Sequence, residues 1–160
     1  MGNSGNMLLT GEFKVTLDEK GRISLPASLR KDLNETSLCL TKGEDNCLWL
    51  FPSSKWEELV STAIKENTDP FSKMDRSLLR RLIGPSQSVE IDKVGRIPII
   101  QSLREWAGLS RDCMVLGQID YIEIWDENRY QQYLADTDEE FIAASENLSN
   151  RIKRKRGIGE

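Results

Sequence analysis

This chain carries an internal repeat that limits the folds open to it. Residues 18–23 (DEKGRI) recur as residues 92–97 (DKVGRI), an offset of 74 positions in the 160-residue sequence. With that offset and no gap, further identities follow: Val15 with Val89, residues 28–30 with 102–104, Cys39 with Cys113, and Gly43 with Gly117. We therefore interpret residues 11–60 and 85–134 as two copies of one unit of roughly 50 residues.

The number of copies indicates how the repeat is used. Two copies are too few for a solenoid, which generally needs about three repeats for stability. A pair is instead expected to form one pseudo-two-fold domain, in which each copy covers the apolar face of the other.

The pattern within each copy is mainly that of β-strands. Phe13, Val15 and Leu17 alternate with polar residues, and an extended pattern resumes at residues 22–25 after a glycine-bearing turn. The later segments are predicted as a short helix over 26–33, a hairpin of strands 38–41 and 47–51, a helix over 55–65 capped by Ser53 or Ser54, a connecting helix over 75–83, a helix near 126–134, a helix over 138–148, and a mobile basic tail over 151–156.

Composition excludes most enzyme mechanisms. The chain has no histidine, so it can form neither a Ser-His or Cys-His nucleophile nor a His-bearing zinc site. It has no glycine-rich phosphate-binding motif either. Its three cysteines form no C-x-x-C and lie in apolar runs, as expected for buried thiols in a reducing compartment. We expect no catalytic residues, no bound metal, no cofactor and no small-molecule substrate.

The sequence also predicts a cytoplasmic location. No apolar run approaches the ~20 residues of a membrane-spanning helix, so no membrane association is expected. The polar segment at residues 1–7 lacks the basic start and apolar run of a signal peptide.

The net charge of −4 is distributed unevenly along the chain. Residues 1–84 hold 12 basic and 12 acidic side chains, residues 85–150 hold 5 and 13, and residues 151–160 hold 5 and 1. Binding to a polyanion depends on local basic patches more than on net charge. The charge distribution therefore allows DNA binding and favours the first half as the contacting half.

Residues 17–30 (LDEKGRISLPASLR) closely resemble the first repeat of the MraZ family, which belongs to the AbrB-like swapped-hairpin superfamily. Residues 43–52 and 122–125 (IEIW) also resemble that family, and the likeness covers residues 7–134. The resemblance implies an α+β, β-rich fold in which two tandem AbrB-like repeats form one pseudo-two-fold swapped-hairpin barrel with peripheral helices. The implied divisions are a first repeat with its helix at 7–67, a connecting helix at 68–84, a second repeat with its helix at 85–134, and a C-terminal helix and basic tail at 135–160.

The resemblance also implies a function. MraZ proteins are DNA-binding transcription factors, usually repressors, that recognise short direct repeats upstream of the division and cell-wall gene cluster. They assemble into rings. The implied partners are therefore double-stranded promoter DNA in the nucleoid and further copies of the same chain.

The repeated Asp-x-x-Gly-Arg motif has a structural and a functional interpretation. Structurally, aspartate initiates a turn, glycine supplies a positive φ, and arginine pairs back to aspartate. Functionally, the arginine fork can bridge phosphate oxygens or the O6 and N7 atoms of guanine. With the resemblance added, we predict DNA contacts from Arg22, Lys20, Lys14, Arg30, Lys31 and Arg96, with motif positioning by Asp18, Gly21, Asp92 and Gly95.

The second copy departs from the first near its motif. Val94 stands where the first copy has Lys20, and residues 98–100 (PII) replace residues 24–26 (SLP). The helix that follows is therefore expected to begin differently. Because Glu90 and Glu105 flank the second motif, Arg96 is ranked below Arg22 and treated as auxiliary.

Three alternatives stay open from the sequence. The chain could be another AbrB-type regulator, although many such relatives carry a single copy and form the barrel as dimers. It could be a ring scaffold or interaction protein that does not bind DNA, which the acidic second half favours. A carboxylate-based enzyme ranks third, because no carboxylate pair stands out.

Overall fold

The computed structural model of the chain describes residues 7–157. The chain forms two compact units, Met1–Glu127 and Asn128–Glu160. The first unit holds every strand of the described range and the helices between them, and the second holds most of α5 and all of α6. Within the described range, no helix has both the length and the apolar character needed to cross a membrane.

The elements of the two copies follow one another in the same order. The first copy contains β1 (Glu12–Thr16), β2 (Arg22–Ser24), α1 (Ala27–Leu33), β3 (Ser37–Lys42), β4 (Leu48–Pro52) and α2 (Ser53–Glu58), which continues as a π-helical stretch (Leu59–Ile64) and a 3₁₀ turn (Lys65–Asn67). The second contains β5 (Gln87–Glu90), β6 (Arg96–Pro98), α4 (Gln101–Ala107), β7 (Asp112–Gly117), β8 (Ile122–Asp126) and α5 (Glu127–Asp136). Helix α3 (Lys73–Leu82) connects the copies, and α6 (Asp138–Lys155) follows the second.

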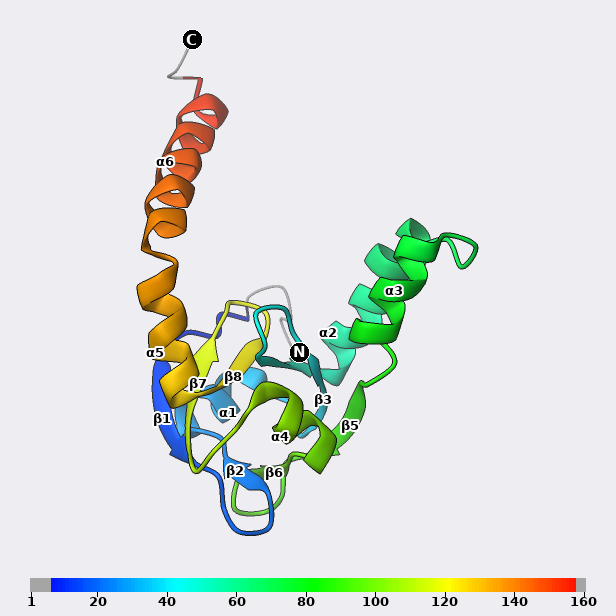
Figure 1. Cartoon of the computed structure of the whole chain (residues 1–160), viewed down its shortest axis with the longest axis vertical. Coiled ribbons are helices and arrows are strands. Elements are labelled where there is room, and N and C mark those ends of the chain that lie inside the picture. The colour runs from blue at the N-terminus through cyan, green and yellow to red at the C-terminus, as the bar shows by residue number, and fades with distance from the viewer. Residues whose placement is uncertain (1–6, 158–160) are drawn as a thin grey trace. The chain divides into compact units, whose positions relative to one another are not determined.

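The two copies exchange strands. The main sheet has the order β1-β7-β8-β4-β3-β5, and β2 and β6 form a separate two-stranded ribbon (Figure 1). The first strand of each copy thus pairs with the third strand of the other, β1 with β7 and β5 with β3. The predicted α+β swapped-hairpin fold built from two tandem repeats is confirmed.

Two strand pairs locate the pseudo-two-fold axis. Ile23 faces Ile97 across the β2–β6 ribbon, and Trp49 faces Glu123 across β4 and β8. The members of each pair are 74 positions apart, so each residue faces its own counterpart in the other copy. Equivalent residues meet only on a two-fold axis, and this axis therefore passes through both pairs.

The third strand of each copy, β3 and β7, shows that the two copies do not align along their whole length without gaps. β1 places Val15 opposite Cys113, whereas β5 places Val89 opposite Leu38. Leu38 is therefore the structural counterpart of Cys113, and the alignment of Cys39 with Cys113 was wrong. The pairing of each third strand with the fourth strand of its own copy shows the same shift of the third strand, since Leu38 pairs with Pro52 and Cys113 pairs with Asp126, and Pro52 and Asp126 are 74 positions apart.

A compensating insertion and deletion explain this shift. The second copy has one more residue between α4 and β7 than the first has between α1 and β3. It also has one residue fewer in its β7–β8 turn than the first has between β3 and β4. The two changes cancel, so β4 and β8 return to the original offset. The alignment of Gly43 with Gly117 was wrong for the same reason, because Gly117 ends β7 whereas Gly43 follows β3.

Both copies contribute to a single core in the first unit. Its fully buried aliphatic side chains come from the strands, from α1 and α4, and from segments next to the strands, and they include Leu9, Ile23, Leu25, Leu29, Leu38, Leu40, Leu48, Leu50, Ile97, Ile99, Leu103, Val115, Ile122 and Ile124. Their removal from water is the main favourable contribution to folding. The prediction that the cysteines are buried is confirmed for Cys39, Cys47 and Cys113.

Helices α1 and α4 begin in the same way, so the expected difference between the copies was wrong. The residue before α1 is Pro26, with φ −55° and ψ 141°, and the residue before α4 is Ile100, with φ −64° and ψ 154°. Proline only presets a φ near −65°, and isoleucine adopts that value without it.

Two other helix starts differ from the sequence-based boundaries. α2 begins at Ser53, directly after Pro52, and no serine side chain caps it. The hydroxyl of Ser53 instead lies 3.1 Å from that of Ser37, which ties the helix to β3. α3 begins at Lys73, two residues earlier than predicted, because the Ser72 hydroxyl caps it by accepting the Asp75 N–H at 3.2 Å.

The predicted mobile basic tail is instead helical. α6 continues from Asp138 to Lys155, so the basic residues at 151–155 form its last turns. Positive charge at a helix C-terminus and negative charge at its N-terminus both interact favourably with the helix dipole, and α6 has both. The sequence-based boundary at Leu148 was therefore too early.

Candidate nucleic-acid interface

Each Asp-x-x-Gly-Arg motif forms a tight turn organised by its aspartate. In the first, Asp18 Oδ1 accepts the backbone N–H groups of Lys20 and Arg22, both at 2.9 Å, and Oδ2 accepts Nε–H of Arg22 at 2.9 Å. Gly21 has a φ of 76° and donates its N–H to Asp18 O at 3.0 Å. The turn thus shows all three features of the structural interpretation.

The second turn repeats this geometry. Asp92 Oδ1 accepts the N–H groups of Val94 at 3.0 Å and Arg96 at 2.9 Å, and Oδ2 accepts Nε–H of Arg96 at 2.8 Å. Gly95 has a φ of 88°. Replacing the lysine of the first turn by Val94 leaves the turn unchanged, because only the backbone of that position takes part.

The two turns lie together at one end of the first unit. β2 and β6 pair in an antiparallel ribbon, and the loops that precede them project on the same side (Figure 1). The ribbon is extended at both ends by reciprocal hydrogen bonds of 2.9 Å, from Leu25 N–H to Gly95 O and from Ile99 N–H to Gly21 O. Each turn therefore accepts a hydrogen bond from the chain segment that follows the turn of the other copy.

The ribbon directs both motif arginines away from the core. Ile23 and Ile97 are fully buried, so their side chains occupy the inner face of the ribbon. Successive residues of a strand alternate between faces, which places Arg22 and Arg96 on the outer face. Arg22 and Arg96 are diagonal neighbours across the two strands. In a regular antiparallel pair, the Cα atoms of such neighbours are about 7–8 Å apart.

The aspartates hold these arginines without covering them. The side chains of Arg22 and Arg96 keep 27% and 34% of their accessible surface. Only Nε of each is engaged, and within residues 7–157 the terminal Nη1 and Nη2 groups have no hydrogen-bond partner. Each guanidinium is fixed in direction yet keeps its outer edge available for a ligand.

Hydrogen bonding keeps both aspartates ionised. The backbone N–H of Arg22 is the main influence that lowers the pKa of Asp18, and the Arg22 side chain lowers it further. The backbone N–H of Arg96 lowers the pKa of Asp92 in the same way. The carboxylates therefore stay charged at neutral pH and keep their arginines in place.

Arg30 and Arg104 form a second, reciprocal link between the copies. The guanidinium of Arg30 lies against Gly95, where an added Cβ would overlap it, and Arg104 lies against Gly21 in the same manner. Arg30 Nη1 also donates to Val94 O of the other copy at 3.4 Å, whereas Arg104 Nη1 donates to Ile99 O of its own copy. Arg30 thus supports the turn of the second copy and not the turn of its own copy.

The remaining predicted contacts occupy different places. Lys20 is exposed within the first turn, and Lys31 is exposed on α1. Lys14 lies on β1 and forms an ion pair with Glu127 at 3.2 Å, although 66% of its side chain stays accessible. The structure therefore brings Lys20, but not Lys14, into the turn region.

Sequence reasoning missed two basic residues of this region. Lys93 is exposed in the second turn, and Arg104 packs on the first. The identity of residues 28–30 and 102–104 was the signal that could have found Arg104. With Arg30 included, the paired turns carry six basic and three acidic side chains: Lys20, Arg22, Arg30, Lys93, Arg96 and Arg104, against Asp18, Glu19 and Asp92.

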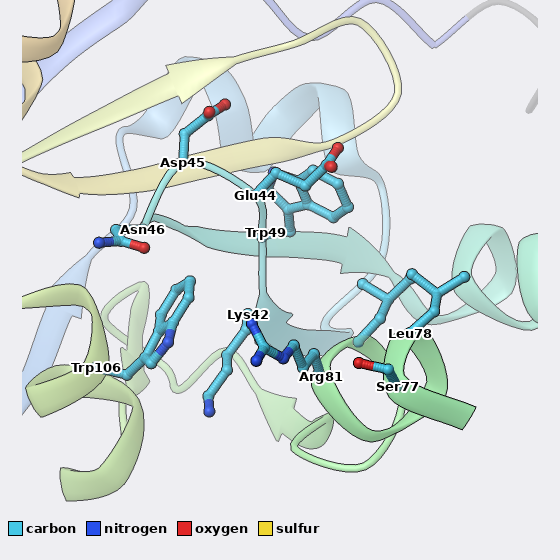
Figure 2. Close-up of a pocket in the computed structure, with 11 residues that line it drawn as sticks. Lys42, Glu44, Asp45, Asn46, Trp49, Ser77, Leu78, Arg81 and Trp106 are labelled. Atoms are coloured by element: carbon cyan, nitrogen blue, oxygen red, sulfur yellow. The ribbon is translucent and has the colours of Figure 1, made fainter. Parts of the chain in front are cut away.

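The first unit also contains a cleft with a volume of about 760 Å³ between α3, the β3–β4 turn and α4 (Figure 2). The Nζ atom of Lys42 lies 5.4 Å from the ring centroid of Trp106. Arg81 adds a positive charge to the lining of the cleft, and Glu44 adds a negative charge. Among the described residues, no group of three or more His, Cys, Asp or Glu side chains could hold a metal ion.

Comparison with known proteins identifies the family. The family model described as "MraZ protein, putative antitoxin-like" matches residues 8–80 and 82–152. The chain belongs to the MraZ family. It is 46% identical over 140 residues to a protein of Treponema denticola named "Transcriptional regulator MraZ", covering 88% of this chain and 96% of that protein. A protein of the same name from Treponema pallidum is 45% identical over 141 residues, covering 88% and 94%.

The resemblance inferred from residues 17–30 is therefore confirmed. The MraZ relatives are named as transcriptional regulators, and the family is one of regulators and not of enzymes.

Proposed function

We propose that this chain is a sequence-specific DNA-binding transcriptional regulator whose paired Asp-x-x-Gly-Arg turns contact the DNA. The names of its relatives support the regulator assignment. The observation that carries the proposal is the pair of arginines on the outer face of the β2–β6 ribbon, each fixed through Nε and open at its terminal nitrogens.

The shape and charge of this region suit duplex DNA. The major groove admits a two-stranded ribbon, and an arginine fork matches the O6 and N7 atoms of guanine or a phosphate. The excess of basic side chains around the turns attracts the phosphate backbone even though the chain as a whole is acidic. Because the two turns have the same geometry, we assign DNA contact to Arg96 as well as Arg22.

We further propose that the chain acts as a repressor at short direct repeats upstream of the division and cell-wall genes, as a ring of several copies. One pair of turns makes few contacts and would bind weakly alone. Several copies on successive repeats gain affinity through effective concentration. The exposed apolar side chains of the α3 region, Phe71, Met74 and Leu78, support assembly, because isolated proteins rarely leave such patches uncovered.

A titration tests the proposal. The protein is added to a labelled duplex with several short direct repeats at rising salt concentrations, and Arg22→Ala and Arg96→Ala are compared with Lys65→Ala. Lys65 is exposed in the helical segment after α2 and serves as the matched loss of one positive charge. We expect salt-sensitive binding that falls by about tenfold to a hundredfold in each arginine variant and little in Lys65→Ala. Equal affinities for all four proteins would instead favour a scaffold that does not bind DNA.

A further inference from the structure

Helix α6 (Asp138–Lys155) has an apolar side that nothing in its own unit covers. Every residue of this 18-residue helix is exposed. Phe141 keeps 70% of its accessible surface, Leu148 keeps 52% and Ile152 keeps 44%. Helices of this length are marginal alone in water and are normally stabilised by packing of an apolar face.

The apolar residues of α6 are arranged for contact with another helix. Phe141, Ser145, Leu148 and Ile152 are spaced by four, three and four positions, so they form one stripe along the helix. Two large side chains lie at the ends of the stripe, and a small and a large one lie at its centre. Residues such as Asn150 lie on the opposite side of the helix.

The two ends of α6 have opposite charge. Its first turn contains Asp138, Glu139 and Glu140, and its last turn contains Lys153, Arg154 and Lys155. A second copy of the same helix running in the opposite direction would bring each acidic end beside a basic end. A parallel arrangement would bring like charges together.

We propose that α6 pairs in antiparallel fashion with α6 of a second copy of this chain. The register that places Phe141 opposite the partner's Ile152 also places Ser145 opposite the partner's Leu148. The same register sets residues 138–140 opposite residues 153–155 of the other helix. One register therefore buries the apolar stripe of both helices and also places their opposite charges side by side. This is the property expected of a self-complementary surface.

This contact is distinct from the ring contacts of the proposed function. An antiparallel helix pair uses the same surface on both copies and closes at two members, whereas a ring needs two different surfaces on each copy. The pair therefore joins two copies, or two rings, and it does not depend on DNA binding.

Charge reversal tests the pairing. One variant carries D138K/E139K/E140K and is basic at both ends of α6, and another carries K153E/R154E/K155E and is acidic at both ends. Molecular mass is measured by sedimentation for each variant and for their equal mixture. We expect each variant alone to have half the mass of the wild-type assembly and the mixture to recover the full mass. A helix weakened by unfavourable end charges would not be rescued by mixing, so recovery identifies pairing.

Single substitutions provide the matched comparison. Leu148→Glu, on the stripe, should halve the mass, and Asn150→Glu, on the opposite side of α6, should leave it unchanged. A wild-type mass in both charge-reversed variants, or in Leu148→Glu, would overturn the proposal. If the wild type is a dimer that these changes convert to a monomer, the result supports the proposed α6 pairing and contradicts the proposed ring.

Cross-linking tests the direction of pairing. Ser145 lies near the centre of the proposed pair, so Ser145→Cys should link to itself on mild oxidation. Phe141→Cys should not link to itself but should link to Ile152→Cys when the two variants are mixed. Self-linking of Phe141→Cys would contradict the antiparallel register. Binding of the wild type to anionic phosphatidylserine vesicles, with no self-linking of Ser145→Cys, would show that the helix meets a membrane surface instead.

Discussion

The guanidinium of Arg30 lies against Gly95, which belongs to the turn of the other copy. Arg104 and Gly21 form the equivalent contact. The shape of each turn is thus set by its own aspartate and by a helix of the opposite copy. This arrangement explains why the two turns stay together and why neither copy is expected to form the region alone.

We expect Gly95→Ala to destabilise the first unit. Alanine at a φ of 88° is strained, and its Cβ would overlap the Arg30 guanidinium. The free energy of unfolding, measured by urea denaturation, should fall by about 1–3 kcal/mol. Gly108→Asn is the matched control. The equivalent residue Asn34 already has a φ of 54°, so this change should cost about 1 kcal/mol or less. Equal stability of Gly95→Ala and the wild type would contradict the proposed packing.

Acid should weaken the turns through Asp18 and Asp92. The folded-state pKa of each lies below the ordinary value of 3.8, so the ionised carboxylates stabilise the folded protein above that value. This contribution is lost as pH falls through the lowered folded-state pKa values. Urea denaturation from pH 6 to pH 2 should therefore show a smaller loss of stability in the Asp18→Asn/Asp92→Asn variant than in the wild type. Asp32→Asn, which changes an exposed carboxylate on α1, is the control, and a double variant with the wild-type pH profile would contradict the prediction.

The native cysteines should be unreactive in the folded protein. Burial raises the pKa of Cys39 to about 11 and that of Cys113 to about 12, and it also raises the pKa of Cys47. Because the thiolate is the reactive form, a thiol-specific chromogenic reagent at pH 7.5 should label none of them within minutes. In guanidinium chloride it should label all three. Asn150→Cys, an exposed position on the side of α6 opposite the proposed contact, supplies the positive control, and rapid labelling of the native wild type would show that the core opens.

Glu123 should be important for stability. It is 9% exposed and accepts hydrogen bonds from the indole N–H groups of Trp49 at 3.2 Å and Trp125 at 3.0 Å. Glu123→Ala leaves both donors without this acceptor, and we expect a loss of roughly 2–4 kcal/mol in the free energy of unfolding. Glu90→Ala, at an exposed position of the edge strand β5, should change it by less than about 0.5 kcal/mol. Similar values for the two variants would contradict the structural role of Glu123.

Much of the fold could be predicted from the repeated hexapeptide. Turn chemistry and alternation predicted the strands around both motifs, and the paired copies predicted a shared core. The one-residue shift of β3 relative to β7 could not be predicted, because its insertion and deletion cancel along the chain. Only the strand partners of Leu38 and Cys113 show it.

The candidate site was predicted less completely. The turns of Asp18 and Asp92 follow from local chemistry, but the contacts of Arg30 and Arg104 join residues of different copies. Local sequence does not indicate such contacts. The acidic composition around Arg96 suggested a lesser role, whereas its geometry depends on the turn and not on the regional charge. The helical state of residues 151–155 depends on their place at the end of α6, where positive charge favours the helix, and composition alone did not indicate it.

The central claim is that Arg22 and Arg96 present their terminal nitrogens to base edges of duplex DNA. The most direct measurement is the ratio of affinities for a direct-repeat duplex and a scrambled duplex, determined for the wild type, Arg22→Ala, Arg96→Ala and Lys20→Ala at one salt concentration. We expect this ratio to fall by about tenfold or more in each arginine variant, and Lys20→Ala to weaken binding to both duplexes equally. A ratio that stays at the wild-type value in both arginine variants would contradict the claim.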